Sequence, residues 1–141
     1  MTALKIVVGI DGSEHATAAL RWALGHAEML HASVEAIYAW QFPVLSLPGA
    51  FTRDELATAA KHVILDAVNA INPPPAVPLH TLVAEGDPRS ALIAAAHDAT
   101  LLVLGNRGRT TFTGLLLGSV SHACAAGAPC PVVIVKIPRG T

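Results

Sequence analysis

Residues Leu101 to Ser121, LLVLGNRGRTTFTGLLLGSVS, are the most informative stretch for the fold. The stretch opens with four apolar residues, which predict a strand buried on both faces. Four glycines then interrupt the pattern: Gly105, Gly108, Gly114 and Gly118. A helical pattern begins at Ser119. Glycines let backbone N–H groups approach a ligand closely, and a first helical turn offers unpaired donors. The stretch therefore predicts a strand, an anion-binding loop and a helix start.

Outward from this stretch, short apolar runs alternate with helical patterns along the whole chain. Strands are predicted at Lys5–Ile10, Ser33–Trp40, Pro78–Ala84, Leu101–Leu104 and Val132–Lys136, and helices at Ser13–His31, Phe51–Ile71, Arg89–His97 and Ser119–Ala126. Such alternation predicts one doubly wound α/β domain over residues 1–141, with a five-stranded parallel sheet and helices on both faces.

Ligands of doubly wound sheets bind beyond the carboxyl ends of the strands, where the strand order reverses. Asp11 and Gly105 each follow a predicted strand directly. In a 3-2-1-4-5 order, which we choose rather than derive from the residues, their two strands are neighbours. With that order, both residues line one ligand site.

The composition excludes several classes of protein. Hydrophobic residues make up 52% of the 141 residues, but the apolar runs are far shorter than the ~18 residues that a membrane helix needs. The net charge is −1, so the basic surface of a nucleic-acid-binding protein is not expected. The start, MTALKIVVG, lacks the basic leader and cleavage site of a secretory signal, which favours a cytoplasmic location.

The sequence contains no motif typical of a metal site or of a serine hydrolase. Cys124 and Cys130 have no zinc or redox spacing and are expected to be reduced thiols without a chemical role. The seven histidines include no pair at i, i+4 and no H-E-x-x-H, so we expect no metal site. The sequence around Ser119 is not a G-x-S-x-G nucleophile elbow. With no evident acid–base pair, the chain is expected to be a binding protein without catalytic residues.

The glycine spacing from Gly105 to Ser119 is G-x2-G-x9-G-S, which is neither a P-loop nor the dinucleotide fingerprint. It resembles the ATP-binding signature of the universal stress protein family. The resemblance extends over nearly the whole chain through IVVGIDGS near the start, GDP before the third helix, LLVLGNRGR, LLLGSVS, and CPVVIVK near the end.

The resemblance implies an adenine nucleotide, ATP with or without Mg²⁺, and a homodimer formed through Val132 to Lys136. By analogy, Asp11 contacts the ribose or adenine, Gly9 gives the base room, Ala39 meets adenine through its backbone and Gly105 lies near the ribose. The phosphates then meet backbone and hydroxyl donors of Gly108, Gly118, Ser119, Val120 and Ser121.

This sequence also departs from the family at three places. Arg107 and Arg109 add positive charge, which either favours phosphate binding or is simply a solvated loop charge. Ala39 replaces a larger aliphatic residue and is expected to widen the base pocket or alter nucleotide preference. Asn106 stands where many relatives carry serine, a small polar exchange that should leave the turn intact.

The resemblance implies a nucleotide-dependent regulator of a stress or dormancy response. Three alternatives remain open: a slow ATPase or other nucleotide-handling enzyme, a cyclic AMP binder, and a protein-interaction module that uses no nucleotide.

Overall fold

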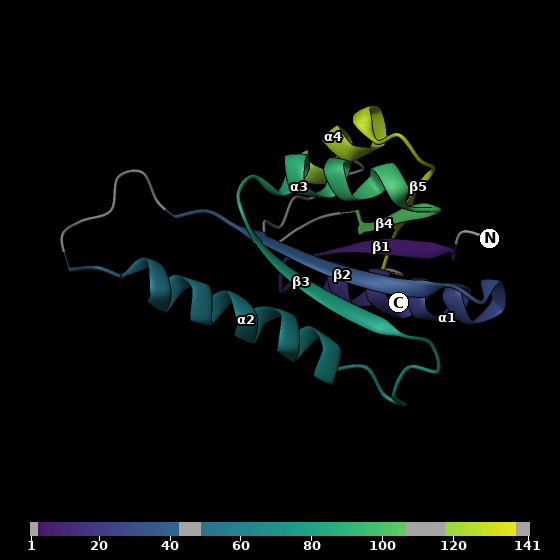
Figure 1. Ribbon diagram of the computed structural model, residues 1–141, viewed down its shortest axis with the longest axis horizontal. Helices are drawn as coiled ribbons and strands as arrows, with labels where there is room; N and C mark the ends of the chain where they lie inside the picture. Colours follow the sequence, from purple (N-terminus) through teal and green to yellow (C-terminus); the bar gives the residue numbers. More distant parts are fainter. Residues whose placement is uncertain (1–2, 43–48, 107–117, 138–141) are drawn as a thin grey trace.

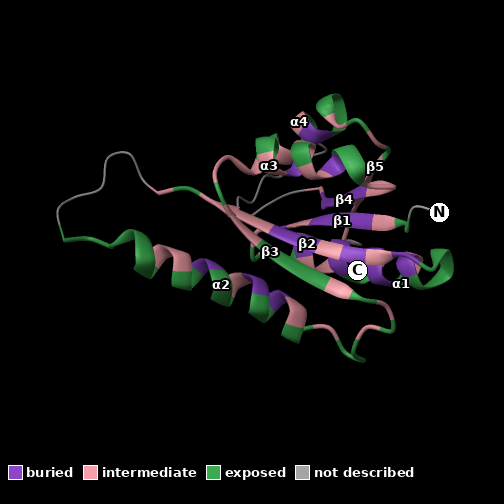
Figure 2. Ribbon diagram, in the orientation of Figure 1, coloured by how far each residue is buried: buried purple, intermediate pink, exposed green. Residues whose placement is uncertain are grey.

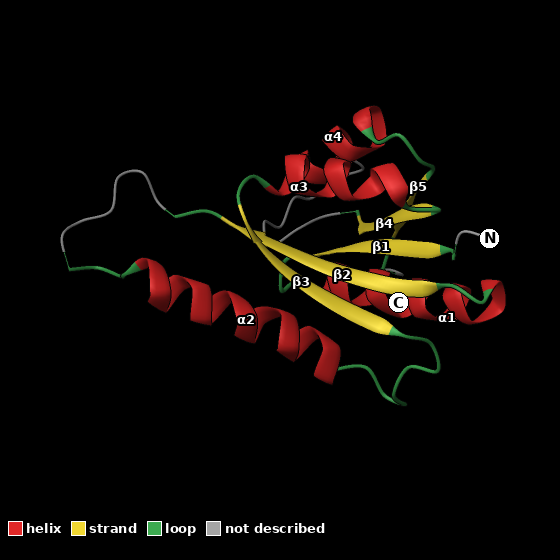
Figure 3. Ribbon diagram, in the orientation of Figure 1, coloured by secondary structure: helices red, strands yellow, loops and turns green. Residues whose placement is uncertain are grey.

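Five parallel strands form the centre of the structure, in the order β3-β2-β1-β4-β5 (Figure 3). The computed structural model describes residues 3–42, 49–106 and 118–137. The strands are β1 (Lys5–Ile10), β2 (Ser33–Trp40), β3 (Leu79–Glu85), β4 (Leu101–Gly105) and β5 (Val132–Val135). This confirms the α/β class and the 3-2-1-4-5 order, with β1 and β4 as neighbours.

Helices cover both faces of the sheet (Figure 1). They are α1 (Glu14–Leu30) and α2 (Arg53–Asn69) on one face, and α3 (Pro88–Ala95) and α4 (Ser119–Gly127) on the other. The third predicted helix is shorter than expected, because its last turn tightens into the 3₁₀ segment η1 (Ala96–Asp98). Within the described residues, no helix is both long and apolar enough to span a bilayer.

The helix starts follow from the residues that precede them. Ser13 caps α1 by accepting a hydrogen bond from the Ala16 N–H at 3.1 Å. Thr52 and Glu55 form a capping box at α2. Asp87 caps α3, and Pro88 occupies the first turn, where its missing N–H costs nothing. The caps at Ser13 and Asp87 each fix where a helix leaves the sheet edge.

Burial is concentrated in the central strands, which Figure 2 shows in purple. Alternate residues of β1 serve two cores: Ile6 and Val8 pack against α1, whereas Val7 packs in the cluster with Leu92 of α3. The neighbouring Gly9 lies against that second core. A Cβ atom built on Gly9 would lie 2.6 Å from Leu104 Cδ2 and 3.0 Å from Leu92 Cδ1, so a side chain there would displace these two leucine side chains.

Gly105, the last residue of β4, lies against the first turn of α1. A Cβ atom built on it would lie 2.7 Å from the carbonyl carbon of His15 and 2.8 Å from its carbonyl oxygen. Real Cβ atoms do not approach backbone atoms so closely, and a backbone cannot turn away as a flexible side chain can. The missing side chain at Gly105 therefore lets α1 begin directly beside β4.

We expect Gly105→Ala to destabilise the protein by about 2–3 kcal/mol, because the added methyl group overpacks the contact with α1. Urea unfolding of the wild-type and variant proteins measures the change. Gly25→Ala is the matched control: a Cβ atom at Gly25 meets nothing within 4 Å, and Gly25 lies inside α1. That substitution should stabilise the protein by about 0.5–1 kcal/mol. Equal effects of the two substitutions would contradict the packing argument.

Candidate functional site

Several of the predicted site residues lie at the edge of the sheet where the strand order reverses, between β1 and β4. β1 and β4 pair in parallel, with Val8 beside Val103, so the ends of both strands lie at the same edge. From that edge, α1 leaves on one face of the sheet and α4 on the other (Figure 1). This is the topological switch point at which doubly wound folds bind their ligands. Asp11, Gly105 and the start of α4 all lie at this edge.

Asp11 is half-buried just beyond β1 and organises the turn into α1. Its Oδ1 accepts hydrogen bonds from the Ser13 N–H at 2.9 Å and from the Ser13 hydroxyl at 2.5 Å. Gly12, between them, has a φ of 84°, which glycine adopts without strain. Among the described residues, no donor reaches Asp11 Oδ2. One carboxylate oxygen therefore holds the turn, and the second can accept a hydrogen bond from a ligand hydroxyl or amine.

The start of α4 differs from the starts of the other three helices of the described chain. Its N-cap is Gly118, which has no side chain to accept a hydrogen bond from the first turn. The Gly118 N–H itself donates to the Asn106 carbonyl at 2.9 Å, which anchors the helix start to the end of β4. The N–H groups of Ser119, Val120 and Ser121 thus begin the helix without a side-chain cap. Such groups carry a partial positive charge and suit an anion.

Ser121 uses its hydroxyl within the protein. The side chain is buried, and its hydroxyl donates to the Gly105 carbonyl at 2.6 Å. This bond ties the first turn of α4 to the end of β4. The hydroxyl hydrogen is therefore already engaged, and the Ser121 backbone N–H is the group that suits a phosphate. Ser119 is exposed at the same helix start, so its hydroxyl is accessible.

The remaining predicted site residues are placed as follows. Ala39 lies half-buried near the end of β2, opposite Ala84 of β3. The space beside Gly9 is filled by Leu104 and Leu92, and its expected contact with the base stays a prediction. Arg107, Gly108 and Arg109 lie outside the described residues, so their expected roles also stay predictions.

Two polar atoms at this edge were not singled out by the sequence patterns. His15 Nδ1 and Asn106 Oδ1 are both buried, and neither has a hydrogen-bond partner among the described residues. His15 packs on Gly105, and Asn106 follows Gly105 in the chain, so both belong to the junction of α1 and β4. Buried polar groups in folded proteins are nearly always paired with protein, water or ligand. The junction is thus suited to accept a polar ligand or water.

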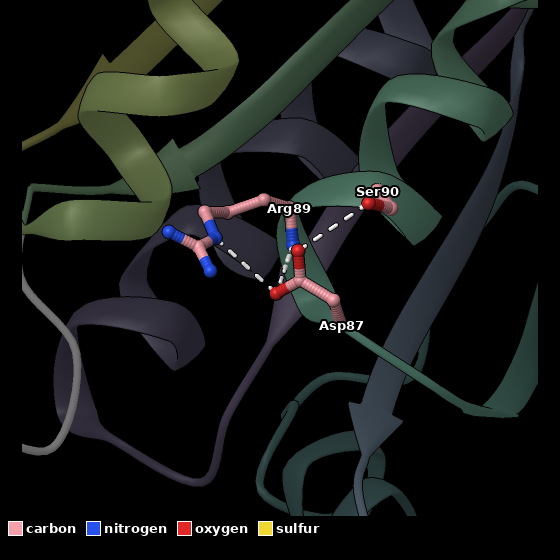
Figure 4. Close-up of polar contacts among 3 residues, drawn as sticks. All are labelled: Asp87, Arg89 and Ser90. Carbon is pink, nitrogen blue, oxygen red and sulfur yellow. Dashed lines mark hydrogen bonds and ion pairs between the residues drawn. The ribbon is translucent and has the colours of Figure 1, made fainter.

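A charged cluster stands at the start of α3, at the same edge of the sheet (Figure 4). Asp87 Oδ1 accepts from the Arg89 Nε at 3.2 Å, and Asp87 Oδ2 accepts from the Ser90 hydroxyl at 3.3 Å. Burial opposes ionisation of Asp87, but the hydrogen bonds and charge of Arg89 outweigh it and hold the Asp87 pKa below its ordinary value. The sequence patterns predicted no ligand contact for Asp87 or Arg89.

Thiol chemistry and metal binding have little support in the described part of the chain. Cys124 is buried and Cys130 half-buried, and both are free thiols, as expected. Burial raises the Cys124 pKa, which keeps this thiol protonated and poorly nucleophilic. No group of three metal-ligating side chains occurs within the described residues. A hollow of about 620 Å³ follows the first turns of α2, between Phe51 and His62, and none of its described lining residues belongs to the predicted site.

Comparison with known proteins agrees with the fold. The model of the universal stress protein family matches residues 3–136. Universal stress protein MJ0531 of Methanocaldococcus jannaschii is 31% identical, over 96% of this chain and 83% of its own length. Universal stress protein Rv2623 of Mycobacterium tuberculosis is 33% identical over 95% of this chain, which spans 48% of that longer relative.

A solved structure, described as a universal stress protein in complex with cAMP, is 27% identical with a TM-score of 0.66. The alignment covers 96% of this chain and 98% of that one. The family match extends over nearly every described element, from the residues before β1 to the end of β5. This chain therefore belongs to the universal stress protein family.

Proposed function

We propose that this protein binds ATP at the β1–β4 edge and acts as a nucleotide-dependent regulator in a stress or dormancy response. The observation that carries the proposal is the start of α4, where three backbone N–H groups lack a side-chain cap at the sheet's switch point. An anionic phosphate chain suits these donors. The open oxygen of Asp11, near the end of β1, suits the hydroxyls of a ribose.

The relative solved with cAMP supports an adenine nucleotide as the ligand class. A cyclic nucleotide has one phosphate, whereas ATP presents three phosphates and more negative charge to the partial positive charge of the helix start, which favours ATP here. The unpartnered atoms of His15 and Asn106 add polar groups that a bound ribose phosphate or its ordered water can satisfy. Any Mg²⁺ would be held chiefly by the bound nucleotide and would supply positive charge beside its phosphates.

We infer a binding role rather than committed catalysis. Hydrolysis of a phosphate chain needs a group that positions the attacking water and groups that stabilise the transferring phosphoryl. The described edge offers Asp11, whose Oδ1 already accepts hydrogen bonds from Ser13, and the thiol of Cys124 in α4 is buried. A slow ATPase remains the second candidate, and phosphate release above that of an Asp11→Asn variant would favour it.

We also propose that the protein acts in the cytoplasm.

The nucleotide proposal predicts that ATP binds the wild-type protein and that Asp11→Asn weakens the binding about five- to tenfold. Asparagine can still accept the Ser13 hydrogen bonds, so the turn is kept while the charge is lost. Isothermal titration calorimetry measures both affinities, and mass spectrometry of the freshly purified protein identifies any nucleotide that copurifies.

Asp66→Asn is the matched control, because Asp66 is an exposed aspartate on α2 and the substitution should leave ATP affinity unchanged. Wild-type protein that binds no adenine nucleotide would leave the interaction-module alternative as the better account. Tighter binding of cyclic AMP than of ATP would favour the cyclic AMP alternative.

We also propose a homodimer that forms through antiparallel pairing of β5. This strand is an edge of the sheet, and each of its four residues is only half-buried. An exposed apolar edge strand favours pairing with another chain. Light scattering at micromolar concentration should give twice the chain mass of 14.5 kDa. Hydrogen exchange should be slower in β5 than in β3, the opposite edge, whereas a monomer with equal exchange at both edges would contradict the proposal.

A further inference from the structure

The first turn of α3 carries a positively charged side chain, Arg89, to which the proposed nucleotide site assigns no role. Arg89 pairs with Asp87 through Nε, and the two terminal nitrogens of its guanidinium have no hydrogen-bond partner among the described residues. The side chain is 53% exposed. A guanidinium has five N–H donors in a planar fork, so a single bond to Asp87 leaves its two-nitrogen face open to another anion.

The helices α3 and α4 begin side by side at the carboxyl edge of the sheet. The chain leaves β3 through Gly86, whose N–H donates to the Trp40 carbonyl at 2.7 Å, and α3 starts directly after it. Leu92 of α3 shares a core cluster with Val120 and Cys124 of α4. Figure 4 shows the Arg89 side chain extending from the first turn of α3 toward the side on which α4 lies.

The negative charge of Asp87 acts on a side chain of α4, the thiol of Cys124. Burial raises the pKa of the Cys124 thiol, and the negative charge of Asp87 raises it further. An electrostatic effect of that kind falls off with distance, so Asp87 lies close enough to Cys124 for its charge to act there. Arg89, which is hydrogen-bonded to Asp87, therefore also lies near α4.

We propose that Arg89 binds the phosphate chain of a nucleotide held at the start of α4, and that Asp87 competes with the ligand for this guanidinium. The inference deepens the proposed function and rests on it. In the free protein, Asp87 holds Arg89 at the sheet edge through one hydrogen bond. When a phosphate chain binds, its oxygens take the open two-nitrogen face and draw Arg89 away from Asp87, while Ser90 continues to hold the Asp87 carboxylate.

This arrangement makes affinity depend on the number of phosphates. A triphosphate presents more negative charge to Arg89 than cyclic AMP, whose phosphate is a diester, and adenosine presents none. Because Arg89 is solvent-exposed and partly neutralised by Asp87, its contribution is moderate and screened by salt. Arg89 thus acts as a specificity residue that favours nucleoside di- and triphosphates.

Calorimetric titrations of ATP, cyclic AMP and adenosine into wild-type, Arg89→Gln and Arg89→Lys proteins test the proposal. Arg89→Gln should weaken ATP binding about five- to tenfold and change adenosine binding less than twofold. Arg89→Lys should recover part of the loss, because it restores the charge without the fork. Lys5→Gln is the control of equal net charge: Lys5 pairs with Asp98 at the opposite edge of the sheet, and its loss should leave ATP affinity unchanged.

The competition from Asp87 gives a prediction of opposite sign. Asp87→Asn keeps a residue that caps α3 but removes the charge, and should strengthen ATP binding about two- to threefold. In the Arg89→Gln background this gain should shrink, which a double-mutant cycle measures. Equal gains in both backgrounds, or ATP binding unaffected by Arg89→Gln, would overturn the role of Arg89 while leaving the nucleotide site intact. If the wild-type protein binds neither ATP nor adenosine, the proposed function and this inference both fail.

Discussion

The contact between Gly105 and the backbone of His15 is the constraint on which the candidate site depends. It brings the end of β4 against the first turn of α1, within a distance that leaves no room for a side chain. On the other face of the sheet, the Gly105 carbonyl accepts the Ser121 hydroxyl and so holds the first turn of α4. One residue therefore joins a strand to two helix starts, and a larger residue there would separate them.

The consequence of this junction is an edge with several polar groups whose hydrogen bonds the protein does not complete. One carboxylate oxygen of Asp11 accepts hydrogen bonds in the turn into α1 and the other stays open. The helix α4 begins at Gly118, which has no side chain to accept a hydrogen bond from its first turn. By contrast, α1, α2 and α3 each begin with a side-chain cap. A glycine N-cap costs only about a few tenths of a kcal/mol relative to a serine or aspartate cap, so the N–H groups at the start of α4 stay open to a ligand with little loss of stability. Arg89, at the adjacent start of α3, adds a positive charge beside them.

Much of this fold could be predicted from local patterns. Buried runs alternating with helical patterns indicate a parallel sheet covered on both faces, and Ser13 and Asp87 stand directly before their helices as caps. The strand order is not encoded locally, because it depends on which strands pair across long separations. The inward turn of the Ser121 hydroxyl and the contact of His15 with Gly105 likewise arise only when β4 packs between α1 and α4. The contributions of Arg107 and Gly108 remain predictions.

Amide NMR spectra of the labelled protein, recorded while ATP is added, test directly whether the uncapped start of α4 and the end of β1 together bind a nucleotide. We expect the resonances of Ser119, Val120 and Asp11 to shift in proportion to bound ATP. The resonances of Lys5 and Asp98, at the opposite edge of the sheet, should remain in place. Shifts confined to that opposite edge or to α2, or no shifts at saturating ATP, would contradict the account.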